Sequence, residues 1–373
     1  MENKKLRIGI IGCGGIANQK HLPALSTFSD IAEIVAFCDV VVERAIEAKE
    51  KYGTEDSGVY ADYLELLKDE SIDLVHVLTP NNSHAPITVA AFEAGKHVLC
   101  EKPMAATSKD AKQMIDAWKK SGKKFTIGYQ NRFRRDVQTL RKACDEDALG
   151  EIYFAKAHAL RRKAVPTWGV FQDKEAQGGG PLIDIGTHAL DITLWMMGNY
   201  KPVSVTGSVF HKMADQVDGN VFGPWDPTTF EVEDSAFGFI KMEDGATIFL
   251  ESSWVLNTTD AKEAATTLCG TKAGAEITSG MGKKGSLIIN KAAYGELVTE
   301  EPTIIGGVDF FDAKHAGEAV AEAKQWLESI INDTEPLVKP EEAFVVTQIL
   351  EAIYKAAETG ETVKINTDET LLV

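Results

Sequence analysis

Residues 6–17 read LRIGIIGCGGIA, an apolar run that passes directly into a cluster of glycines. The apolar run from Leu6 to Ile11 predicts a buried β-strand. The pattern G-x-G-x-x-A follows at once, formed by Gly12, Cys13, Gly14, Gly15, Ile16 and Ala17. In such a turn the first glycine permits the tight bend, the second lets a pyrophosphate approach the backbone, and a small third residue allows close packing of helix on strand. The stretch therefore predicts a dinucleotide site at a helix N-terminus.

Glycines alone are a weak signal, because any strand-to-helix turn can use them. Asp39 strengthens the prediction: it ends the second predicted strand, 22 residues beyond Ala17, where a carboxylate can accept hydrogen bonds from ribose hydroxyls. That carboxylate would repel a 2′-phosphate, and the three valines at 40–42 place no cation beside it. The expected cofactor is therefore NAD rather than NADP.

Strand-like and helical patterns alternate up to about residue 127, which is typical of βαβ units on a parallel sheet. The expected strands are Leu6–Ile11, Ile34–Cys38, Leu74–Leu78, His97–Cys100 and Phe125–Gly128, with helices at Val41–Tyr52, Tyr63–Asp69, Ala85–Ala94 and Ser108–Ser121.

Beyond Phe133 a helix near Asp136–Ala143 leads into strands that turn cues such as Glu243-Asp244-Gly245 join as hairpins. The expected strands are Glu151–Leu160, Val203–Val209, Glu233–Lys241, Ala246–Trp254 and Ser286–Asn290, followed by helices at Ala313–Ile331 and Glu341–Glu358. The predicted fold is α/β: an N-terminal Rossmann domain over 1–127, and an α+β domain with a large open, mostly antiparallel sheet over 128–373.

Composition excludes some partners. The 373 residues carry a formal net charge of −17, which repels nucleic acid and anionic membrane surfaces. The N-terminal apolar run is too short for a signal-peptide core or a membrane span. Five widely spaced cysteines suit a reduced, cytoplasmic interior better than a disulfide framework.

Two polar turns follow predicted parallel strands directly: Thr79-Pro80-Asn81-Asn82-Ser83-His84, and Glu101-Lys102-Pro103. Ligands bind at the carboxyl edge of open α/β sheets, so both turns should face the nicotinamide half of the cofactor. Thr79, Asn81, His84, Glu101 and Lys102 are accordingly candidate cofactor contacts. The alternative is a pair of ordinary polar loops with a helix cap and a solvated lysine.

Residues 178–191, GGGPLIDIGTHALD, begin a helix that is apolar on nearly every side yet carries Asp184, His188 and Asp191. At i, i+4 and i+7 these three side chains fall within an arc of roughly 60°. Buried ionisable groups are costly unless they are paired or used, so this stripe is a candidate reaction site.

These motifs together resemble the glucose-fructose oxidoreductase, inositol dehydrogenase and rhizopine-catabolism (Gfo/Idh/MocA) family. The resemblance runs from about residue 6 to 200 and includes GYQNRF at 128–133. It implies that Lys102, Asp184 and His188 line the reaction site, that Lys102-Pro103 is cis, and that the open sheet mediates homodimer or homotetramer contacts. Tyr129 and Arg132 are further candidate substrate contacts.

The implied reaction is hydride transfer between nicotinamide and a secondary hydroxyl or ketone of a sugar, inositol or related polyol. His188 would be the acid/base, Asp184 would orient substrate or imidazole, and Lys102 would stabilise the oxygen. Both domains must then contribute to one cavity. Asp191 is expected to support His188 or to touch a substrate hydroxyl.

The segment RRKAVPTWGVF at 161–171 is not a general motif of the family and is expected to tailor the pocket. Trp168 is either a core aromatic or a surface on which a sugar or nicotinamide stacks. The run Arg161, Arg162 and Lys163 is either a solvated strand end or, with Arg162 pointing inward, a contact for an acidic sugar.

Three other functions remain open at this stage. The first is a glycosidase that uses retained NAD for transient oxidation of the sugar. The second is metal chemistry on Asp184, His188 and Asp191, although we expect no metal. The third is a non-catalytic regulator that senses sugar or dinucleotide, which would be free to lose Lys102 or His188.

Overall fold

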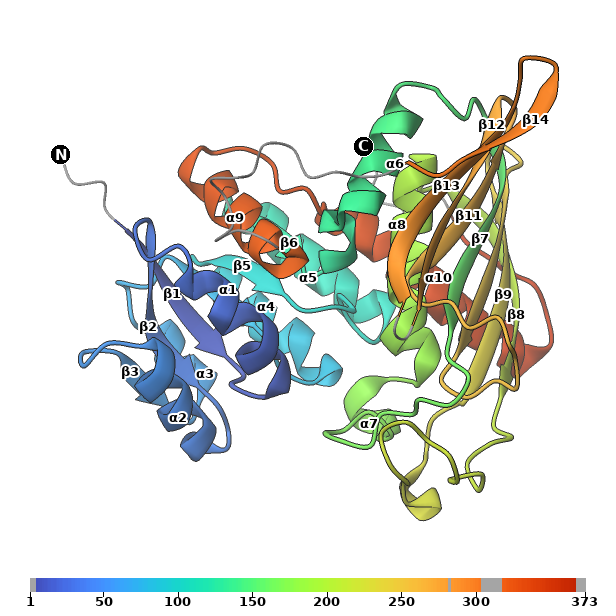
Figure 1. Ribbon diagram of the computed structural model, residues 1–373. Helices are drawn as coiled ribbons and strands as arrows, with labels where there is room; N and C mark the ends of the chain where they lie inside the picture. Colours follow the sequence, from blue (N-terminus) through green and yellow to red (C-terminus); the bar gives the residue numbers. More distant parts are fainter. Residues whose placement is uncertain (1–4, 281–282, 303–316, 367–373) are drawn as a thin grey trace. The chain divides into compact units, whose positions relative to one another are not determined.

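The computed structural model describes residues 5–280, 283–302 and 317–366. The chain forms two compact units, each with its own sheet (Figure 1). Unit 1 comprises residues 1–105, 109–133 and 307–340, and unit 2 comprises 106–108, 134–306 and 341–373.

Unit 1 is built on a six-stranded parallel sheet, which confirms the predicted Rossmann architecture. The strand order is β3-β2-β1-β4-β5-β6, so β1 lies at the centre, where the order of strands reverses direction. The strands are β1 (Leu6–Ile11), β2 (Ala32–Cys38), β3 (Gly58–Tyr60), β4 (Leu74–Val77), β5 (His97–Cys100) and β6 (Phe125–Ile127).

Strand β3 was not foreseen, because its sequence, Gly-Val-Tyr, is half-buried throughout and carries no apolar run. The helical segments of unit 1 include the four that were expected. They are η1 (Ala17–His21), α1 (Leu22–Ser26), α2 (Val42–Tyr52), α3 (Tyr63–Leu67), η2 (Asn81–Ser83), α4 (His84–Glu93), α5 (Ser108–Ser121), η3 (Gln130–Phe133) and α9 (Glu318–Ile331). One of them, η1, is a π-helix, a rare form that is frequent at functional sites.

The helix α9 differs from the sequence-based expectation, which placed both closing helices in the second domain. It packs in unit 1 instead. Its side chains Ala323, Trp326 and Leu327 are buried in one hydrophobic cluster with residues of β1, β2, α1 and α2. This apolar face is buried against η3, α1 and η1, which lie far away in sequence, so no local pattern reveals it. The predicted start of this helix at Ala313 lies outside the described residues.

Unit 2 contains a nine-stranded sheet in the order β14-β13-β12-β11-β7-β10-β9-β8-β15. Its pairings are antiparallel except between β7 and β10, so the prediction of a mostly antiparallel sheet is confirmed. The strands are β7 (Ile152–Leu160), β8 (Pro202–Phe210), β9 (Ser235–Met242), β10 (Thr247–Ser253), β11 (Ala265–Gly270), β12 (Ala273–Gly280), β13 (Lys283–Ala293), β14 (Glu296–Glu300) and β15 (Val363–Lys364). Strands β11, β12, β14 and β15 were not foreseen.

The helical segments of unit 2 are α6 (Arg135–Asp145), α7 (Lys174–Gln177), η4 (Leu182–Gly186), α8 (Thr187–Met197), η5 (Pro227–Thr229) and α10 (Pro340–Thr359). Within this unit α8 packs on β7 and β11 (Figure 1), while η4 packs on β10 and β7. The fully buried alanines of β7, at 155, 157 and 159, leave room for that close approach.

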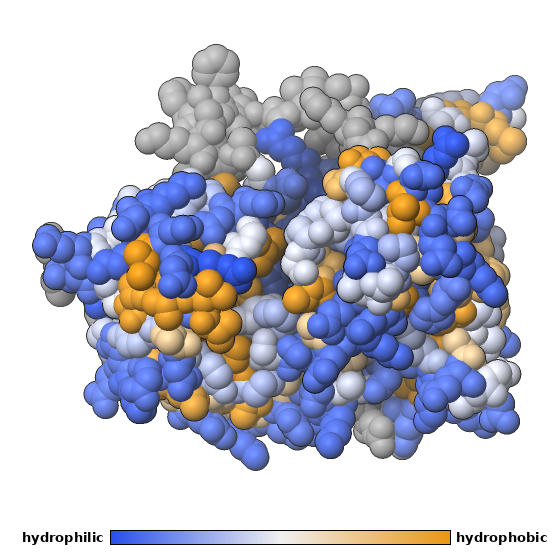
Figure 2. Space-filling model, turned by 90° about the horizontal axis from the view of Figure 1, so that it is seen from below, coloured by the Kyte–Doolittle hydropathy of each residue, from blue (hydrophilic) through white to orange (hydrophobic). Residues whose placement is uncertain are grey.

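Figure 2 shows one face of the molecule, largely hydrophilic, with hydrophobic side chains gathered in a few groups. The abundance of acidic over basic residues, 56 against 39, accounts for the charged surface. Among the described residues there is no helix with both the length and the apolar character needed to cross a membrane.

Candidate active site

The glycine-rich turn between β1 and η1 has the geometry that the sequence predicts. Gly12 has φ +94°, and a Cβ there would lie 2.6 Å from the carbonyl oxygen of Leu78, so the position requires glycine. Asn18 clamps the turn, because its Nδ2 donates to the carbonyl oxygens of Cys13 at 2.8 Å and Gly14 at 3.0 Å. Ala17 is fully buried.

Gly14 tests whether the turn fits a dinucleotide. A Cβ added at Gly14 would meet no atom of the described residues within 4 Å, so packing among them does not demand glycine there. The open space over the backbone suits a bound pyrophosphate. Thr79, which follows β4 at the same edge of the sheet, has a buried Oγ1 with no hydrogen-bond partner among the described residues, as expected of a group that awaits a ligand.

Asp39 is buried at the end of β2, and two main-chain amides fix its carboxylate. Its Oδ2 accepts from Cys13 N and its Oδ1 from Val41 N, each at 2.9 Å. Val40 and Val41 beside it are 89% and 40% exposed, which offers an apolar surface to an adenine ring. Arg44, however, lies one turn into α2 with Nη1 3.8 Å from Asp39 Oδ1, so the expectation of no cation beside Asp39 was wrong.

The turn after β4 is held from inside by His84. This side chain is fully buried, with Nε2 2.9 Å from the carbonyl oxygen of Thr79 and Nδ1 2.8 Å from that of Pro103. Burial lowers the pKa of His84 although both carbonyls favour the charged ring. The two ring nitrogens of His84 thus hold the turns at Thr79 and Pro103 together. Asn81, which begins η2, is nine-tenths buried.

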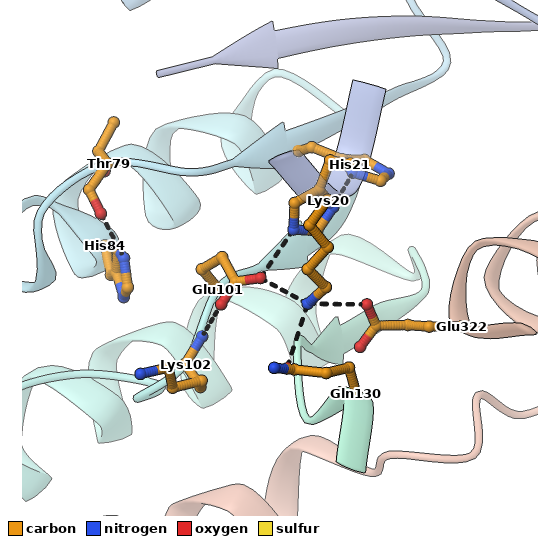
Figure 3. A network of polar contacts seen from close by, with 9 residues as sticks. Lys20, His21, Thr79, His84, Glu101, Lys102, Gln130 and Glu322 are labelled. Atoms are coloured by element: carbon orange, nitrogen blue, oxygen red, sulfur yellow. Dashed lines mark hydrogen bonds and ion pairs between the residues drawn. The ribbon is translucent and has the colours of Figure 1, made fainter. Parts of the chain in front are cut away.

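Lys102 follows β5, and the Lys102-Pro103 peptide is cis, as the family resemblance implied. Glu101 is almost wholly buried and accepts a hydrogen bond from the main-chain N–H of Lys102 at its Oε2, 3.1 Å away (Figure 3). A Cβ added at Gly128 would lie 2.9 Å from the other oxygen, Oε1. The carboxylate of Glu101 is therefore tightly confined.

Behind Glu101 lies a set of polar side chains, most of them buried, which the sequence did not predict and which we call the Lys20 cluster. It comprises Lys20 and His21 of η1, Glu101, Gln130 of η3 and Glu322 of α9 (Figure 3), together with His76 of β4. Lys20 stands in the polar run Asn18-Gln19-Lys20-His21, so its sequence neighbours gave no hint that its amine lies inside the unit.

Burial and neighbouring charges shift the pKa values of the groups in this cluster in different directions. Burial would lower the pKa of Lys20, but Glu101 and Glu322 outweigh it and raise that pKa. Burial would likewise raise the pKa of Glu101, yet Lys20 and His21 hold it well below its usual range. For Glu322 desolvation prevails, and its pKa is raised. Burial, with His21 and Lys20 nearby, lowers the pKa of His76 well below its usual range.

In unit 2 the predicted stripe begins in the π-helix η4 and continues in α8. Asp184 lies in η4 and is half-buried, with its Oδ2 accepting from Trp254 Nε1 at 3.0 Å. His188 and Asp191 lie one turn apart on α8 and are 8% and 0% exposed. The regular α-helix that we expected is thus widened at its start, which alters the direction of Asp184 relative to His188.

The glycine triplet 178–180 and Glu233 anchor this helix. Glu233 Oε2 accepts from Gly180 N at 2.8 Å, and Oε1 accepts from Leu182 N at 3.1 Å and from the hydroxyl of Tyr354 at 2.8 Å. Cβ atoms at Gly179 and Gly180 would lie 2.0 Å from Tyr354 Oη and 2.3 Å from the Glu233 carbonyl oxygen, respectively. The triplet is therefore needed for close packing, a reason that the sequence did not reveal.

The remaining candidates differ in their surroundings. Tyr129 and Arg132 are fully buried, and Arg132 Nη1 donates to the Leu337 carbonyl oxygen at 3.4 Å. Trp168 is 52% exposed, so it is not a core residue, and its ring meets Phe222 edge-on at 4.8 Å between centroids.

The cationic residues that follow β7 have different surroundings. The Arg161 guanidinium forms a two-point ion pair with Glu263, through Nε at 2.8 Å and Nη2 at 2.5 Å, whereas Arg162 is exposed. No group of three His, Cys, Asp or Glu side chains arranged to hold a metal ion occurs in the part of the chain that the structure describes.

Both units match models of one family. Residues 6–129 match the oxidoreductase family, NAD-binding Rossmann fold, and residues 141–365 match its C-terminal alpha/beta domain. The chain belongs to the Gfo/Idh/MocA family of oxidoreductases, and unit 1 is its NAD-binding domain.

Among its relatives, D-glucoside 3-dehydrogenase of Escherichia coli is 37% identical over 98% of this chain and 99% of its own. Inositol 2-dehydrogenase of Salmonella typhimurium is 32% identical over 54% of this chain and 57% of its own. Of solved structures, aldose-aldose oxidoreductase from Caulobacter crescentus has a TM-score of 0.78 at 27% identity, covering 97% of this chain and all of its own. The protein is therefore an NAD-dependent oxidoreductase of a family of sugar and inositol dehydrogenases.

Proposed function

We propose that this protein transfers a hydride between NAD and a secondary hydroxyl of a sugar ring, with a glucoside as the first candidate substrate and an inositol as the second. The observation that carries the proposal is the cradle formed by the glycine turn and Asp39, with Lys102 following a strand at the same sheet edge. A glucoside comes first because the glucoside dehydrogenase aligns over almost the whole chain and the inositol dehydrogenase over about half.

Residues Gly12, Gly14, Gly15, Ile16 and Ala17 would hold the pyrophosphate, Asp39 the ribose, and Thr79, Asn81 and Glu101–Lys102 the nicotinamide half. When bound, NAD supplies the hydride acceptor. The chain itself must handle the proton and the oxygen that the hydride leaves behind.

We assign the proton to His188 and the developing charge on oxygen to Lys102. An imidazole without a proton on one ring nitrogen can take the hydroxyl proton, and a cationic donor stabilises the oxygen most where water is excluded. Asp184, fixed by Trp254, would orient the substrate or the imidazole. Tyr129, Arg132, Arg162 and Trp168 are proposed as further substrate contacts, with exposed Trp168 offering an aromatic face to a sugar.

The experiment is a substrate panel with the purified protein and NAD, following absorbance of the reduced cofactor. The panel contains glucosides, free sugars, inositols, sugar phosphates and nucleotide sugars, each also tested with NADP. Net NADH from a glucoside, with the oxidised carbon located by NMR, is the expected result. Glycoside cleavage without net NADH would instead identify a glycosidase that retains its cofactor. NAD binding without turnover of any sugar would identify a regulator.

We also propose that the protein assembles as a homodimer or homotetramer through the outer face of the unit 2 sheet. Phe249 of β10 is 43% exposed there, and its ring lies 5.6 Å from that of Phe154 and 5.0 Å from that of Phe239. Exposed aromatic rings on a sheet face favour association.

A further inference from the structure

The Lys20 cluster contains charged groups, Lys20 and Glu322, to which the proposed reaction gives no role. Lys20 Nζ lies 2.7 Å from Glu101 Oε1, 2.9 Å from Glu322 Oε2 and 3.3 Å from Gln130 Oε1. The side chains of Lys20, Glu101 and Glu322 are 9%, 6% and 6% exposed. Four segments distant in sequence thus meet around one amine (Figure 3).

The cluster fixes the orientation of the Glu101 carboxylate. Lys20 and His21 both approach Oε1, each at 2.7 Å, which leaves Oε2 aligned to accept from the main-chain N–H of Lys102. Gly128 closes the remaining side. Rotation of the carboxylate would break three contacts at once, so the position of the Lys102 backbone depends on this anchor.

Stability alone is a poor explanation for these charges. A buried ion pair adds little to stability, and apolar residues of similar volume would hold α9 at least as well. The cluster even contains two buried polar atoms without a hydrogen-bond partner among the described residues, Glu322 Oε1 and His76 Nε2. Because burying these charges costs free energy, we interpret them as groups that orient the Glu101 carboxylate rather than as packing contacts.

We propose that Lys20 and Glu322 are positioning residues, which hold Glu101 so that its carboxylate fixes the backbone of Lys102 for the reaction. The inference rests on the proposed role of Lys102. It also gives α9 a function: the helix carries Glu322 from the C-terminal part of the chain to the back of the lysine turn.

A double-mutant cycle tests this proposal. Lys20→Met and Glu322→Gln are each made in the wild-type protein and in Lys102→Ala, and kcat and the KM for NAD are measured with the best substrate of the panel. We expect each single change to lower kcat by about tenfold with the KM for NAD within about twofold, because the Asn18 clamp on the glycine turn is untouched. In the Lys102→Ala background the same two changes should cause no further loss of kcat.

The outcomes separate the hypotheses. Equal fold-losses with and without Lys102 would mean that the cluster acts only through general structure, and unchanged kcat in both single variants would also overturn the proposal. If Lys102→Ala itself retains full turnover, the proposed function fails instead. Should Lys20→Met not fold, Glu322→Gln preserves the shape of the site, and Lys20→Arg should restore most of kcat.

The pH profile gives a second readout. Glu101 faces Lys20 and His21 from η1, Glu322 from α9 and the adjacent Lys102, with His76 behind His21. Without the Lys20 cation the carboxylate takes up a proton at higher pH. The acid limb of kcat should therefore move to higher pH in Lys20→Met, whereas a merely structural loss would leave its midpoint unchanged.

Discussion

At the scale of single residues, Lys102 and His188 carry the chemistry that we propose. We expect Lys102→Ala and His188→Ala each to lower kcat by at least about a hundredfold, because each removes a group that acts on the reacting hydroxyl. NAD binding, measured by fluorescence titration, should persist. The matched controls are Lys109→Ala and His211→Ala, which truncate exposed residues of the same types. Wild-type turnover in either active-site variant would refute that residue's assignment.

Cofactor preference depends on Asp39 and its neighbour Arg44. Asp39→Ala removes the carboxylate that repels a 2′-phosphate and leaves the Arg44 guanidinium in place, so the ratio of kcat/KM for NADP to that for NAD should rise by about tenfold or more. Asp39→Asn, which keeps a side-chain oxygen for a main-chain amide, controls for damage to the turn.

Adding Arg44→Ala to Asp39→Ala should abolish most of the gain with NADP. If the double variant uses NADP as well as the single one, Arg44 takes no part in recognition. A cofactor ratio that Asp39→Ala leaves unchanged would place ribose recognition elsewhere.

At the scale of elements, η4 depends on its anchor in Glu233. Glu233→Ala leaves two buried main-chain donors and the Tyr354 hydroxyl without their acceptor, so we expect a loss of at least about 2 kcal/mol in the free energy of unfolding. Tyr354→Phe removes one of the three bonds and should cost about 1 kcal/mol. Urea unfolding followed by circular dichroism measures both. Equal stability of Glu233→Ala and wild type would show that the anchor is dispensable.

His97, the first residue of β5, should make the stability of the protein depend on pH. Burial lowers the pKa of His97 from 6.5 to about 4, and its Nδ1 accepts from Lys124 N at 2.9 Å. Between these values the unfolded chain binds a proton that the folded chain does not, so stability is full above 6.5 and falls as the pH drops towards 4. His97→Gln removes that titration.

The Tm of His97→Gln should therefore fall less than that of wild type between pH 7 and pH 5. The control His211→Gln changes an exposed imidazole and should follow the wild-type curve. Parallel curves for all three proteins would show that His97 does not contribute to the pH dependence.

At the scale of the whole molecule, we expect assembly to depend on the outer face of the unit 2 sheet. Phe249→Glu places a charge among the rings of that face and should shift the protein to a smaller species in sedimentation velocity. Ile46→Glu is the matched control, since Ile46 of α2 is equally exposed, at 43%, but lies in unit 1. An unchanged oligomer in Phe249→Glu would exclude this face as the interface, and a monomeric wild type would overturn the proposal.

Much of the fold could be predicted because its signals are local. The strand Leu6–Ile11, the helix Ser108–Ser121 and the hairpin turn at Gly245 are found where the apolar period and the turn residues indicated. Strand β15 was missed because it has only two residues, and β11 because its sequence, ATTLCG, shows no regular alternation of apolar and polar residues.

The amino-acid sequence was enough to predict the dinucleotide turn, the acidic residue after β2, the lysine turn and the family, because each depends on residue types at fixed spacing along one segment. Three features became visible only in the folded chain: α9 completes unit 1, Lys20 and Glu322 meet behind Glu101, and Glu233 anchors η4. These contacts join residues more than 50 positions apart, and a buried charge is recognisable only once its partner is known.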